Sequence, residues 1–576
     1  MNAERLLQHY EQIADAPDAI ARLRRFILDL AVRGKLVPQD CGDEPASELL
    51  KRIAEEKARL LKAGEIRTPK PLSAVVDAPF SIPSNWSWSQ IAEIGIMSPR
   101  NDAPDALETS FVPMPLIAAE YGVANRHEVR TWGEIKKGYT HFAEGDVGLA
   151  KITPCFENGK STVFRNLTGG IGSGTTELHV VRPLLVMADY ILLFWKSPHF
   201  IETGIPKMTG TAGQKRVPTD YFANAPFPLP PLAEQHRIVA KVDELMALCD
   251  ALEAARTERE TKRDRLAAAS FARLNTPDPE SFREDARFVL DSLPALTARP
   301  DQVKPLRQTI LNLAVRGKLV PQDPTEERAE ELLARISMER AKRARNGDIP
   351  KPKATNRDVT RLSDGLPVGW SPIALGDVCD LVTSGSRGWG EYYADSGPGF
   401  VRAQNIRFGR MRLDDLAYVR PPSNSEGSRT QVYRNDLLIV ITGAGVTNPA
   451  LLKEDLGEAY VSQHVGLVRP SDTDLSRWML LCLMADAGGR GELLECAYGA
   501  GKPGLNLDNI RSLSIPLPPL AEQHRIVAKV DELMALCDQL ETSLTSADET
   551  RKQLLDALLA EALAPVDIEV LQEAAE

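Results

Sequence analysis

Two stretches of the 576-residue chain carry apolar residues at alternating spacings of four and three, which is the heptad pattern of a long helix packed along one face. In the first stretch these residues are Ile238, Val242, Leu245, Cys249 and Leu252, and in the second they are Ile526, Val530, Leu533, Cys537, Leu540 and Leu544. A proline-rich turn precedes each stretch, and proline does not occupy helix interiors. The pattern predicts long helices over about 232–272 and 520–563, each roughly 60 Å long at 1.5 Å per residue.

Shorter helical patterns lie elsewhere in the chain. Amphipathic helices are expected at Leu23–Val37 and Leu306–Val320, and charged helices at Glu44–Lys62 and Glu326–Arg345. The charged pair ends near Gly64 and Gly347, which is typical of a helix stop.

Between these helices, the chain changes to short β-type runs broken by Gly, Asn, Asp and Pro. The clearest are Ser161–Phe164, Leu178–Val181, Leu437–Ile441 and Tyr460–Ser462. The predicted fold class is therefore α+β, with mixed α/β domains that carry functional loops.

Internal repeats organise the chain. The string PLPPLAEQHRIVAKVDELMALCD occurs at Pro228–Asp250 and again, without a change, at Pro516–Asp538. LRRFILDLAVRGKLVPQD at Leu23–Asp40 is closely matched at Leu306–Asp323. We call these four segments the frame. The chain is thus two units of about 285 residues with the same order of parts (516 − 228 = 288 and 306 − 23 = 283).

The two segments enclosed by the frame differ much more; we call residues 80–227 insert 1 and residues 365–515 insert 2. Both enter through a proline-containing segment ending in tryptophan, Trp86 or Trp370, and both contain a Val-Arg-Pro string. They are expected to be two copies of one fold with diverged surfaces and different targets. A recent duplication in which one copy drifted is the alternative. The predicted divisions are 1–79, 80–227, 228–364, 365–515 and 516–576.

Two packings of the long helices are open. The seams could pair with each other as an antiparallel coiled coil, which would give the molecule pseudo-two-fold symmetry, and this packing is favoured. Alternatively, each seam faces its own globular domain.

Composition narrows the class of protein. Hydrophobic residues make up 43% and charged residues 26%, as in a globular protein. No stretch has the ~20 uncharged apolar residues of a membrane helix, and the polar N-terminus resembles neither a secretory signal nor a transit peptide. Seven scattered cysteines predict reduced thiols in the cytoplasm.

Charge argues against a protein that wraps nucleic acid unaided, because the net charge is −11. Insert 1 has 13 basic and 14 acidic residues, and insert 2 has 14 and 17.

Catalytic motifs are absent. No phosphate-binding loop, nucleophile elbow, zinc-protease motif or paired C-x-x-C occurs in the sequence. Gly172–Thr176 is the nearest approach to a phosphate loop but lacks its lysine, and we interpret it as a β-turn. His236 and His524 repeat within the AEQHR strings of the frame, where a structural or subunit-contact role is expected rather than catalysis.

The frame resembles that of the specificity subunits of type I restriction–modification systems. The carrying residues are PLPPLAEQ at the exit of each insert and L-x-x-A-V-x-G-K-L at Leu28–Leu36 and Leu311–Leu319. The resemblance covers nearly the whole chain. It implies two target-recognition domains, each reading one half of a bipartite double-stranded DNA site, with the long helices as a ruler between them.

The implied partners are two methylation subunits and, in the full complex, two restriction subunits. No cofactor is expected in this chain, and S-adenosylmethionine is expected in the methylation subunit. The rather extended N-terminal frame departs from many relatives. A fused restriction or methylation enzyme is disfavoured by the missing motifs, and a coiled-coil scaffold that binds two proteins without reading DNA is the remaining alternative.

Polar and basic residues in the glycine-rich loops of the inserts are the candidates for DNA contact, since Arg and Lys pair with guanine and Asn and Gln with adenine. In insert 1 they are Lys151, Asn158, Lys160, Gln214, Lys215 and Arg216, and in insert 2 they are Ser386, Arg387, Arg402, Gln404, Asn405, Thr442 and Lys502. Each alone also fits a turn or a solvated surface position. Trp389 and Tyr392 are expected in a core.

Overall fold

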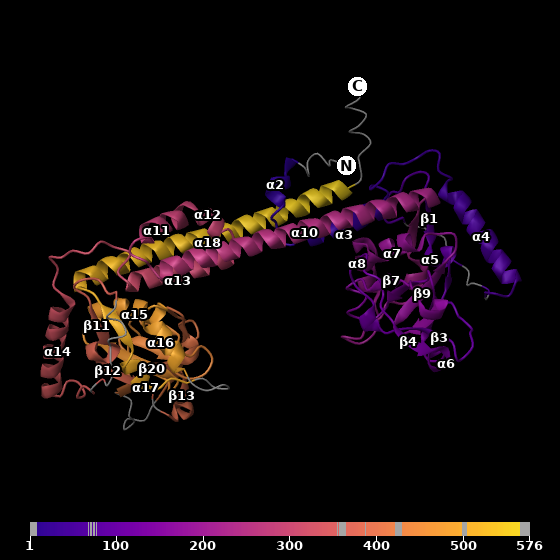
Figure 1. Cartoon of the computed structure of the whole chain (residues 1–576). Coiled ribbons are helices and arrows are strands. Elements are labelled where there is room, and N and C mark those ends of the chain that lie inside the picture. The colour runs from indigo at the N-terminus through magenta and orange to yellow at the C-terminus, as the bar shows by residue number, and fades with distance from the viewer. Residues whose placement is uncertain are drawn as a thin grey trace. The chain divides into compact units, whose positions relative to one another are not determined.

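A computed structural model describes residues 8–66, 68, 72, 75, 78–353, 355, 365–385, 387–420, 429–497 and 504–564. The chain forms two compact units (Figure 1). Unit 1 contains residues 1–259 and 547–576, and unit 2 contains residues 260–546. Helix α10 (Leu232–Asn275) therefore begins in unit 1 and ends in unit 2, whereas α18 (Leu520–Leu563) begins in unit 2 and ends in unit 1.

The predicted helices are confirmed, with shifted ends. The long helices start directly after the paired prolines, and the glutamine of each AEQHR string folds back on the turn: Gln235 Nε2 donates to Pro230 O at 3.0 Å, and Gln523 Nε2 to Pro518 O at 2.8 Å. The other frame-associated helices are α2 (Tyr10–Ile13), α3 (Ala19–Val32), α4 (Ala46–Lys62), α11 (Phe282–Asp291), α12 (Leu293–Leu296), α13 (Pro300–Val315) and α14 (Ala329–Asn346).

Insert 1 is a pair of four-stranded sheets closed by a strand pair where the chain enters and leaves. The sheet orders are β2-β9-β6-β7 and β4-β3-β8-β5, and the closing pair is β1-β10. The strands are β1 (Ser87–Gln90), β2 (Gly95–Met97), β3 (Glu108–Val112), β4 (Glu128–Thr131), β5 (Thr140–Ala143), β6 (Val147–Ala150), β7 (Ser161–Val163), β8 (Ile171–Gly174), β9 (Leu178–Pro183) and β10 (Pro226–Leu229). Its helices are α5 (Ile91–Ile94), α6 (Trp132–Ile135), α7 (Ala188–Lys196), α8 (Pro198–Gly204) and α9 (Thr219–Asn224).

Insert 2 repeats the strand order of the first sheet, but its second sheet has three strands instead of four. Its sheets are β12-β20-β17-β18 and β16-β13-β19, with a β14-β15 hairpin and the closing pair β11-β21. The strands are β11 (Ser371–Ala374), β12 (Cys379–Ser384), β13 (Tyr393–Val401), β14 (Ile406–Arg407), β15 (Arg410–Met411), β16 (Ala417–Val419), β17 (Leu437–Val440), β18 (Pro449–Leu451), β19 (Ala459–Val461), β20 (Val465–Pro470) and β21 (Ser514–Leu517). Its helices are α15 (Ser476–Met484), α16 (Gly489–Cys496) and α17 (Leu507–Arg511).

Weak sequence echoes between the inserts correspond to a shared buried ion pair. Asp146, 1% exposed, accepts two hydrogen bonds from Arg182 of β9 at 2.8 and 2.9 Å. Asp436, 2% exposed, accepts the same pair from Arg469 of β20 at 2.9 and 2.7 Å. The Val-Arg-Pro strings supply these arginines. The first sheet and this ion pair are thus common to the two inserts, and the expectation that the inserts are two copies of one fold stays a prediction.

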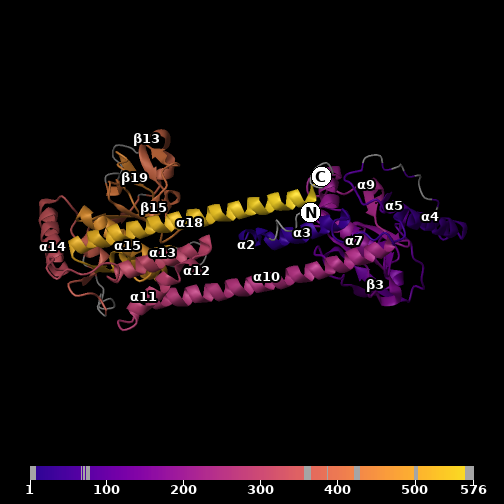
Figure 2. The same cartoon turned by 90° about the horizontal axis from the view of Figure 1, so that it is seen from above.

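In unit 1, α3 lies between the first half of α10 and the end of α18 (Figure 2). Arg24 pairs with Asp250 at 2.6 Å and with Glu253 at 2.7 Å. On the other side, Lys35 Nζ donates to Leu563 O, the last residue of α18, at 3.0 Å and to Ala564 O, directly after it, at 2.7 Å.

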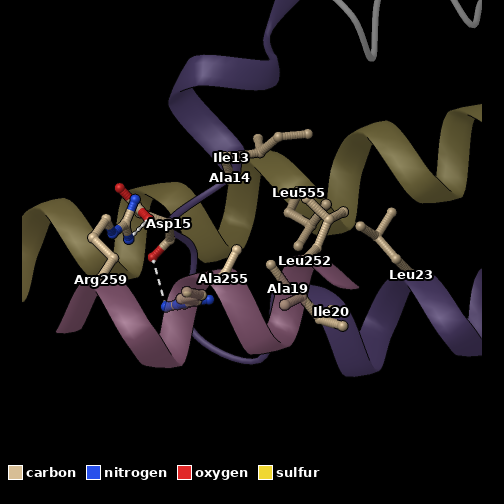
Figure 3. A pocket seen from close by; sticks show the side chains of 11 residues that line it. Ile13, Ala14, Asp15, Ala19, Ile20, Leu23, Leu252, Ala255, Arg259 and Leu555 are labelled. Atoms are coloured by element: carbon tan, nitrogen blue, oxygen red, sulfur yellow. Dashed lines mark hydrogen bonds and ion pairs between the residues drawn. The ribbon is translucent and has the colours of Figure 1, made fainter. Parts of the chain in front are cut away.

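An apolar cluster joins the end of α18 to α2 and α3. It contains Ile13, Ala16, Ala19, Phe26, Leu30, Leu555, Leu558, Leu559 and Ala562. A cavity of about 320 Å³ adjoins this cluster, and Asp15 turns toward Arg259 at its rim (Figure 3).

Unit 2 uses equivalent contacts. Arg307 of α13 pairs with Asp538 at 2.7 Å and with Glu541 at 2.9 Å, at the repeat positions of the Arg24 contacts. The end of α10 packs on α11, α12 and α13, and Asn312 Nδ2 donates to Asn275 Oδ1 at 2.9 Å.

The first halves of the heptad seams pack within their own units. Ile238, Val242 and Cys249 share one core with Trp86 and α3, whereas Leu252 is 43% exposed. Ile526, Val530 and Cys537 share the matching core with Trp370 in unit 2. The first half of each seam therefore faces the globular domain of its own unit, which was the alternative in the sequence analysis. Pairing of the two long helices with each other stays a prediction.

The β-turn interpretation of Gly172–Thr176 is wrong for Gly172–Gly174; only Thr175 and Thr176 lie in the connection between β8 and β9. Residues 171–174 form strand β8, buried between β3 and β5. A Cβ atom on Gly172 would lie 2.3 Å from Ser110 O and 2.6 Å from the Phe142 ring, so only glycine fits this strand position.

Candidate nucleic-acid interface

One edge of insert 1 gathers loops that are far apart in the sequence. Lys151 N donates to Glu177 O at 3.0 Å and Thr153 N to Lys215 O at 2.9 Å. Val217 N returns to Lys151 O at 2.8 Å. The loops 151–160, 175–177 and 209–216 therefore meet where β6 ends and β9 begins.

Five of the six candidate side chains of insert 1 are exposed or half-buried at this edge without a carboxylate partner among the hydrogen bonds and ion pairs of the described residues; they are Lys151, Asn158, Lys160, Gln214 and Lys215. Lys160 Nζ donates to Met114 O at 3.3 Å, which draws in the segment after β3. Arg216 instead makes a two-bond pair with Glu177, at 2.9 and 2.8 Å. Hydrogen bonding from Arg216 lowers the pKa of the Glu177 carboxyl.

Two residues at this edge were missed by the sequence analysis. Glu177 orients Arg216, but no motif marks it, because its partner is 39 residues away. Lys196 is 7% exposed and its Nζ donates to Ala119 O at 2.8 Å and to Gly159 O at 3.1 Å, fastening the loop that carries Asn158 and Lys160. Burial lowers the pKa of Lys196 to about 7.

The corresponding edge of insert 2 gathers residues 385, 387–388, 402–405, 441–448 and 462–464. Ser462 N donates to Val401 O and Ile441 N to His464 O, both at 2.9 Å. Gly385 lies so close to this crossing that a Cβ atom there would sit 2.0 Å from Val461 O. Its glycine is therefore a steric requirement.

Several insert 2 candidates are occupied within their own loop. Asn405 is fully buried, and its Nδ2 donates to Arg412 O and Asp415 O, both at 3.0 Å. Gln404 Nε2 donates to Asp415 Oδ2 at 2.7 Å, and Arg402 Nη2 donates to Asp415 O at 2.9 Å. Asn405 thus organises the 402–415 loop, and its assignment as a base-contacting residue stays a prediction.

The other insert 2 candidates divide by exposure. Arg387 is exposed and Thr442 is half-buried. Ser386 and Lys502 lie outside the described residues. Trp389 is 5% exposed and packs with Phe400, Val419 and Tyr460, which confirms its core placement; Tyr392 is partly buried against the same cluster.

The loops preceding the frame occupy the same place in both inserts. Ile152 bridges to Arg216 in insert 1, and Thr442 bridges to Gly504 in insert 2. Val217 N bonds to Lys151 O, and Leu505 N bonds to Ile441 O at 2.8 Å in the same way. The two edges are therefore equivalent surfaces with different side chains.

The AEQHR strings are part of the frame core rather than of these edges. Glu234, Gln235, Glu522 and Gln523 are at most 1% exposed, whereas His236 and His524 face outward. Gln235 Oε1 accepts from Met187 N at 2.9 Å, which fixes the helix to insert 1.

The described residues also bear on metal sites and membrane spans. They contain no group of three or more His, Cys, Asp or Glu side chains placed to hold a metal ion. Within the same residues, no helix combines the length and apolar character needed to cross a bilayer.

Comparison with known proteins gives consistent matches. Residues 367–547 match the model of the type I restriction modification DNA specificity domain. The chain is 38% identical over 559 residues to the type I restriction enzyme EcoAI specificity subunit of Escherichia coli, covering 94% of this chain and 93% of that protein. It is 39% identical over 569 residues to the EcoEI specificity subunit of the same species, covering 94% of both. The solved HsdS subunit from Thermoanaerobacter tengcongensis is 22% identical, with a TM-score of 0.44 over 84% of this chain and 98% of that one.

Proposed function

Because the chain belongs to the family of type I restriction–modification specificity subunits, we propose that it selects the DNA target of such a complex, with each insert reading one half of a bipartite site. The chain is the non-catalytic member of the complex. Adenine methylation and restriction are carried out by its partner subunits.

The observation that carries this proposal is the pair of equivalent insert edges. The first sheet has the same strand order in both inserts, and matching backbone hydrogen bonds bring the corresponding loops together. The side chains on these loops differ between the inserts. A constant scaffold with different polar side chains suits two DNA half-sites of different sequence.

The charge balance of the inserts is compatible with this function. Cations gather locally at the edge of insert 1, namely the exposed Lys215 and the half-buried Lys151 and Lys160, although the insert as a whole is not basic. Phosphate contacts are local and fix the register of a protein on DNA. We expect weak DNA binding by the isolated chain and stronger binding once cationic partner surfaces are added.

We propose two methylation subunits per chain, with two restriction subunits added in the full complex. The frame presents one outward surface twice: His236 matches His524, and Leu248, 53% exposed, matches Leu536, 52% exposed. S-adenosylmethionine is assigned to the methylation subunit. Native mass spectrometry should give two methylation subunits for one chain, and a strict one-to-one complex would contradict this part of the proposal.

The decisive test exchanges one insert. Residues 365–515 are replaced with the corresponding segment of a relative that has a different target, and the methylated motif is sequenced in cells that carry the chain with its methylation subunit. One half-site should change while the other half-site and the spacer are retained. A change in both half-sites would show that the inserts do not read DNA independently.

The alternative is a scaffold that joins two protein partners without reading DNA. In that case, exchanging either insert would leave the methylated motif unchanged. The same experiment therefore separates the two functions.

A further inference from the structure

A three-residue connection joins the two sheets in each insert. In insert 1 it is Thr175-Thr176-Glu177, between β8 and β9; in insert 2 it is Ser462-Gln463-His464, between β19 and β20. β8 pairs in parallel with β3, and β19 with β13. β9 pairs with β6, and β20 with β17. The connection therefore stands where the sheets meet, between the other loops of the edge.

The backbone of this connection is fixed in the same way twice. The amide after β6, at Lys151, donates to Glu177 O at 3.0 Å, and the amide after β17, at Ile441, donates to His464 O at 2.9 Å. The first residue is a small hydroxyl residue in both copies: Thr175 is half-buried and its Oγ1 accepts from Glu177 N at 3.2 Å, and Ser462 is 6% exposed. The second residue is exposed in both copies.

The side chains at the second and third positions differ between the copies. Thr176 corresponds to Gln463, and Glu177 corresponds to His464. In insert 1, Glu177 holds Arg216. In insert 2, the Gln463 amide has a single side-chain contact in the hydrogen bonds recorded for the described residues, Nε2 to His464 Nε2 at 3.3 Å.

The Gln463 side chain is therefore available for contact with a ligand, whereas other polar side chains at this edge are not. Asn405 is buried, and Gln404 and Arg402 are hydrogen-bonded to Asp415. Gln463 is an exposed carboxamide on a rigid connection, which is the arrangement that favours precise recognition.

Resting on the DNA-reading function proposed above, we propose that this connection is the specificity-determining element of each insert and that Gln463 reads an adenine in the major groove. A carboxamide accepts from adenine N6 and donates to N7. Thr176 occupies the corresponding position toward the other half-site.

The test uses the chain assembled with its methylation subunits. The complex selects DNA from a library in which each half-site position is randomised in turn, so the readout does not depend on methyl transfer. Gln463→Ala should lower the preference for adenine at one position of the insert 2 half-site by roughly ten- to a hundredfold. The insert 1 half-site should be unchanged.

A second variant tests whether the carboxamide of Gln463 is the group that recognises the base. Gln463→Glu should change the preferred base at that same position, since a carboxylate accepts from cytosine N4 and lacks the donor for adenine N7. Thr473→Ala is the matched control, because Thr473 is exposed beyond the opposite end of β20. It should select the parent sequence.

If both Gln463 variants select the parent sequence at every position, the proposal is wrong. If the insert exchange still changes one half-site in that case, the DNA-reading function stands and only the assignment to the connection fails. If the exchange changes neither half-site, the proposed function itself fails.

Discussion

Charged and polar residues of the inserts serve two purposes that the sequence does not separate. Some form hydrogen bonds and ion pairs inside the fold, as do Asp436 with Arg469 and Lys196 with its backbone acceptors. Others, such as Lys151 and Lys215, remain at the loop edge with no ion pair recorded among the described residues. Only the side chains of the second group are available for contact with DNA.

Lys151→Gln removes a cation from the edge of insert 1 without disturbing the backbone bonds of its loop. If Lys151 contacts a phosphate, the slope of log affinity against log salt for the assembled complex should become shallower by about 0.9. Binding titrations at several salt concentrations measure this slope. Lys51→Gln on α4 is the control, since Lys51 is exposed and pairs with Glu48. If the slope changes equally in both variants, Lys151 does not contact a phosphate and the prediction is wrong.

Glu522 gives a pH-dependent prediction. It is 1% exposed, and its Oε2 accepts from Trp370 Nε1 at 2.9 Å. Burial raises the pKa of this carboxyl above 4.5, the value for an exposed glutamate, although Trp370 and Arg525 oppose the shift. The folded state therefore holds the proton more tightly, and its free energy of unfolding falls as pH rises from below 4.5 through the folded-state pKa.

Glu522→Gln keeps an acceptor for Trp370 and removes the buried charge. Its thermal midpoint at pH 7 should equal or exceed that of the parent, and the difference should shrink toward pH 4. Thermal melts across this range check the prediction, with Glu532→Gln, an exposed position of the same helix, as the control. A variant less stable than the parent at pH 7 but not at pH 4 would reverse the sign and contradict it.

At the scale of elements, each short frame helix has two neighbours from different parts of the chain. In unit 1, α3 packs on the start of α10 and on the end of α18. In unit 2, α13 packs on the start of α18 and the end of α10. The last turns of α18 thus belong to the core of unit 1. They contact α3, which is more than 500 residues earlier in the sequence.

Leu555→Ala tests that packing. Leu555 is 1% exposed and clusters with Ile13, Ala16 and Phe26. The cavity should lower the stability of this contact by about 2–5 kcal/mol. Faster hydrogen exchange is expected in residues 8–32, with no change in insert 2. Leu536→Ala, at a position 52% exposed on the same helix, is the control and should leave residues 8–32 protected.

Element types could be predicted where one local signal dominates. The proline turn and heptad spacing predicted the start of α18 at Leu520 to the residue. The heptad pattern shows which face of a helix is buried, but not what covers it, so the cores around Ile238 and Ile526 could not be read from it. Gly172 was interpreted as a turn residue because the groups that require glycine there lie on other strands. These groups are the Phe142 ring and Ser110 O.

The candidate site was predictable only as a set of loops. Individual side chains could not be ranked. Asn405 and Gln463 are both polar loop residues in the sequence, and only the contacts with Arg412 and Asp415 show that Asn405 is consumed by its own loop.

At the scale of the whole molecule, the two long helices are continuous connections between the units. Each has one end in each unit, with the division after Arg259 in α10 and after Ser546 in α18. If the helices set the distance between the two reading edges, lengthening one of them alone is opposed by the other. Four residues added after Leu252 should therefore lengthen the DNA spacer by only one or two base pairs or abolish assembly.

Matched insertions give the sharper test. Seven residues added after Arg259 together with seven added after Ser546 keep both heptad patterns in phase, since seven residues make two turns. They add about 10 Å at 1.5 Å per residue, or roughly three base pairs at 3.4 Å per pair. Sequencing of the methylated motif should show a spacer about three base pairs longer and unchanged half-site bases, because no residue of either insert is altered. An active variant with new half-site bases and the original spacer would place specificity in the frame and refute the ruler.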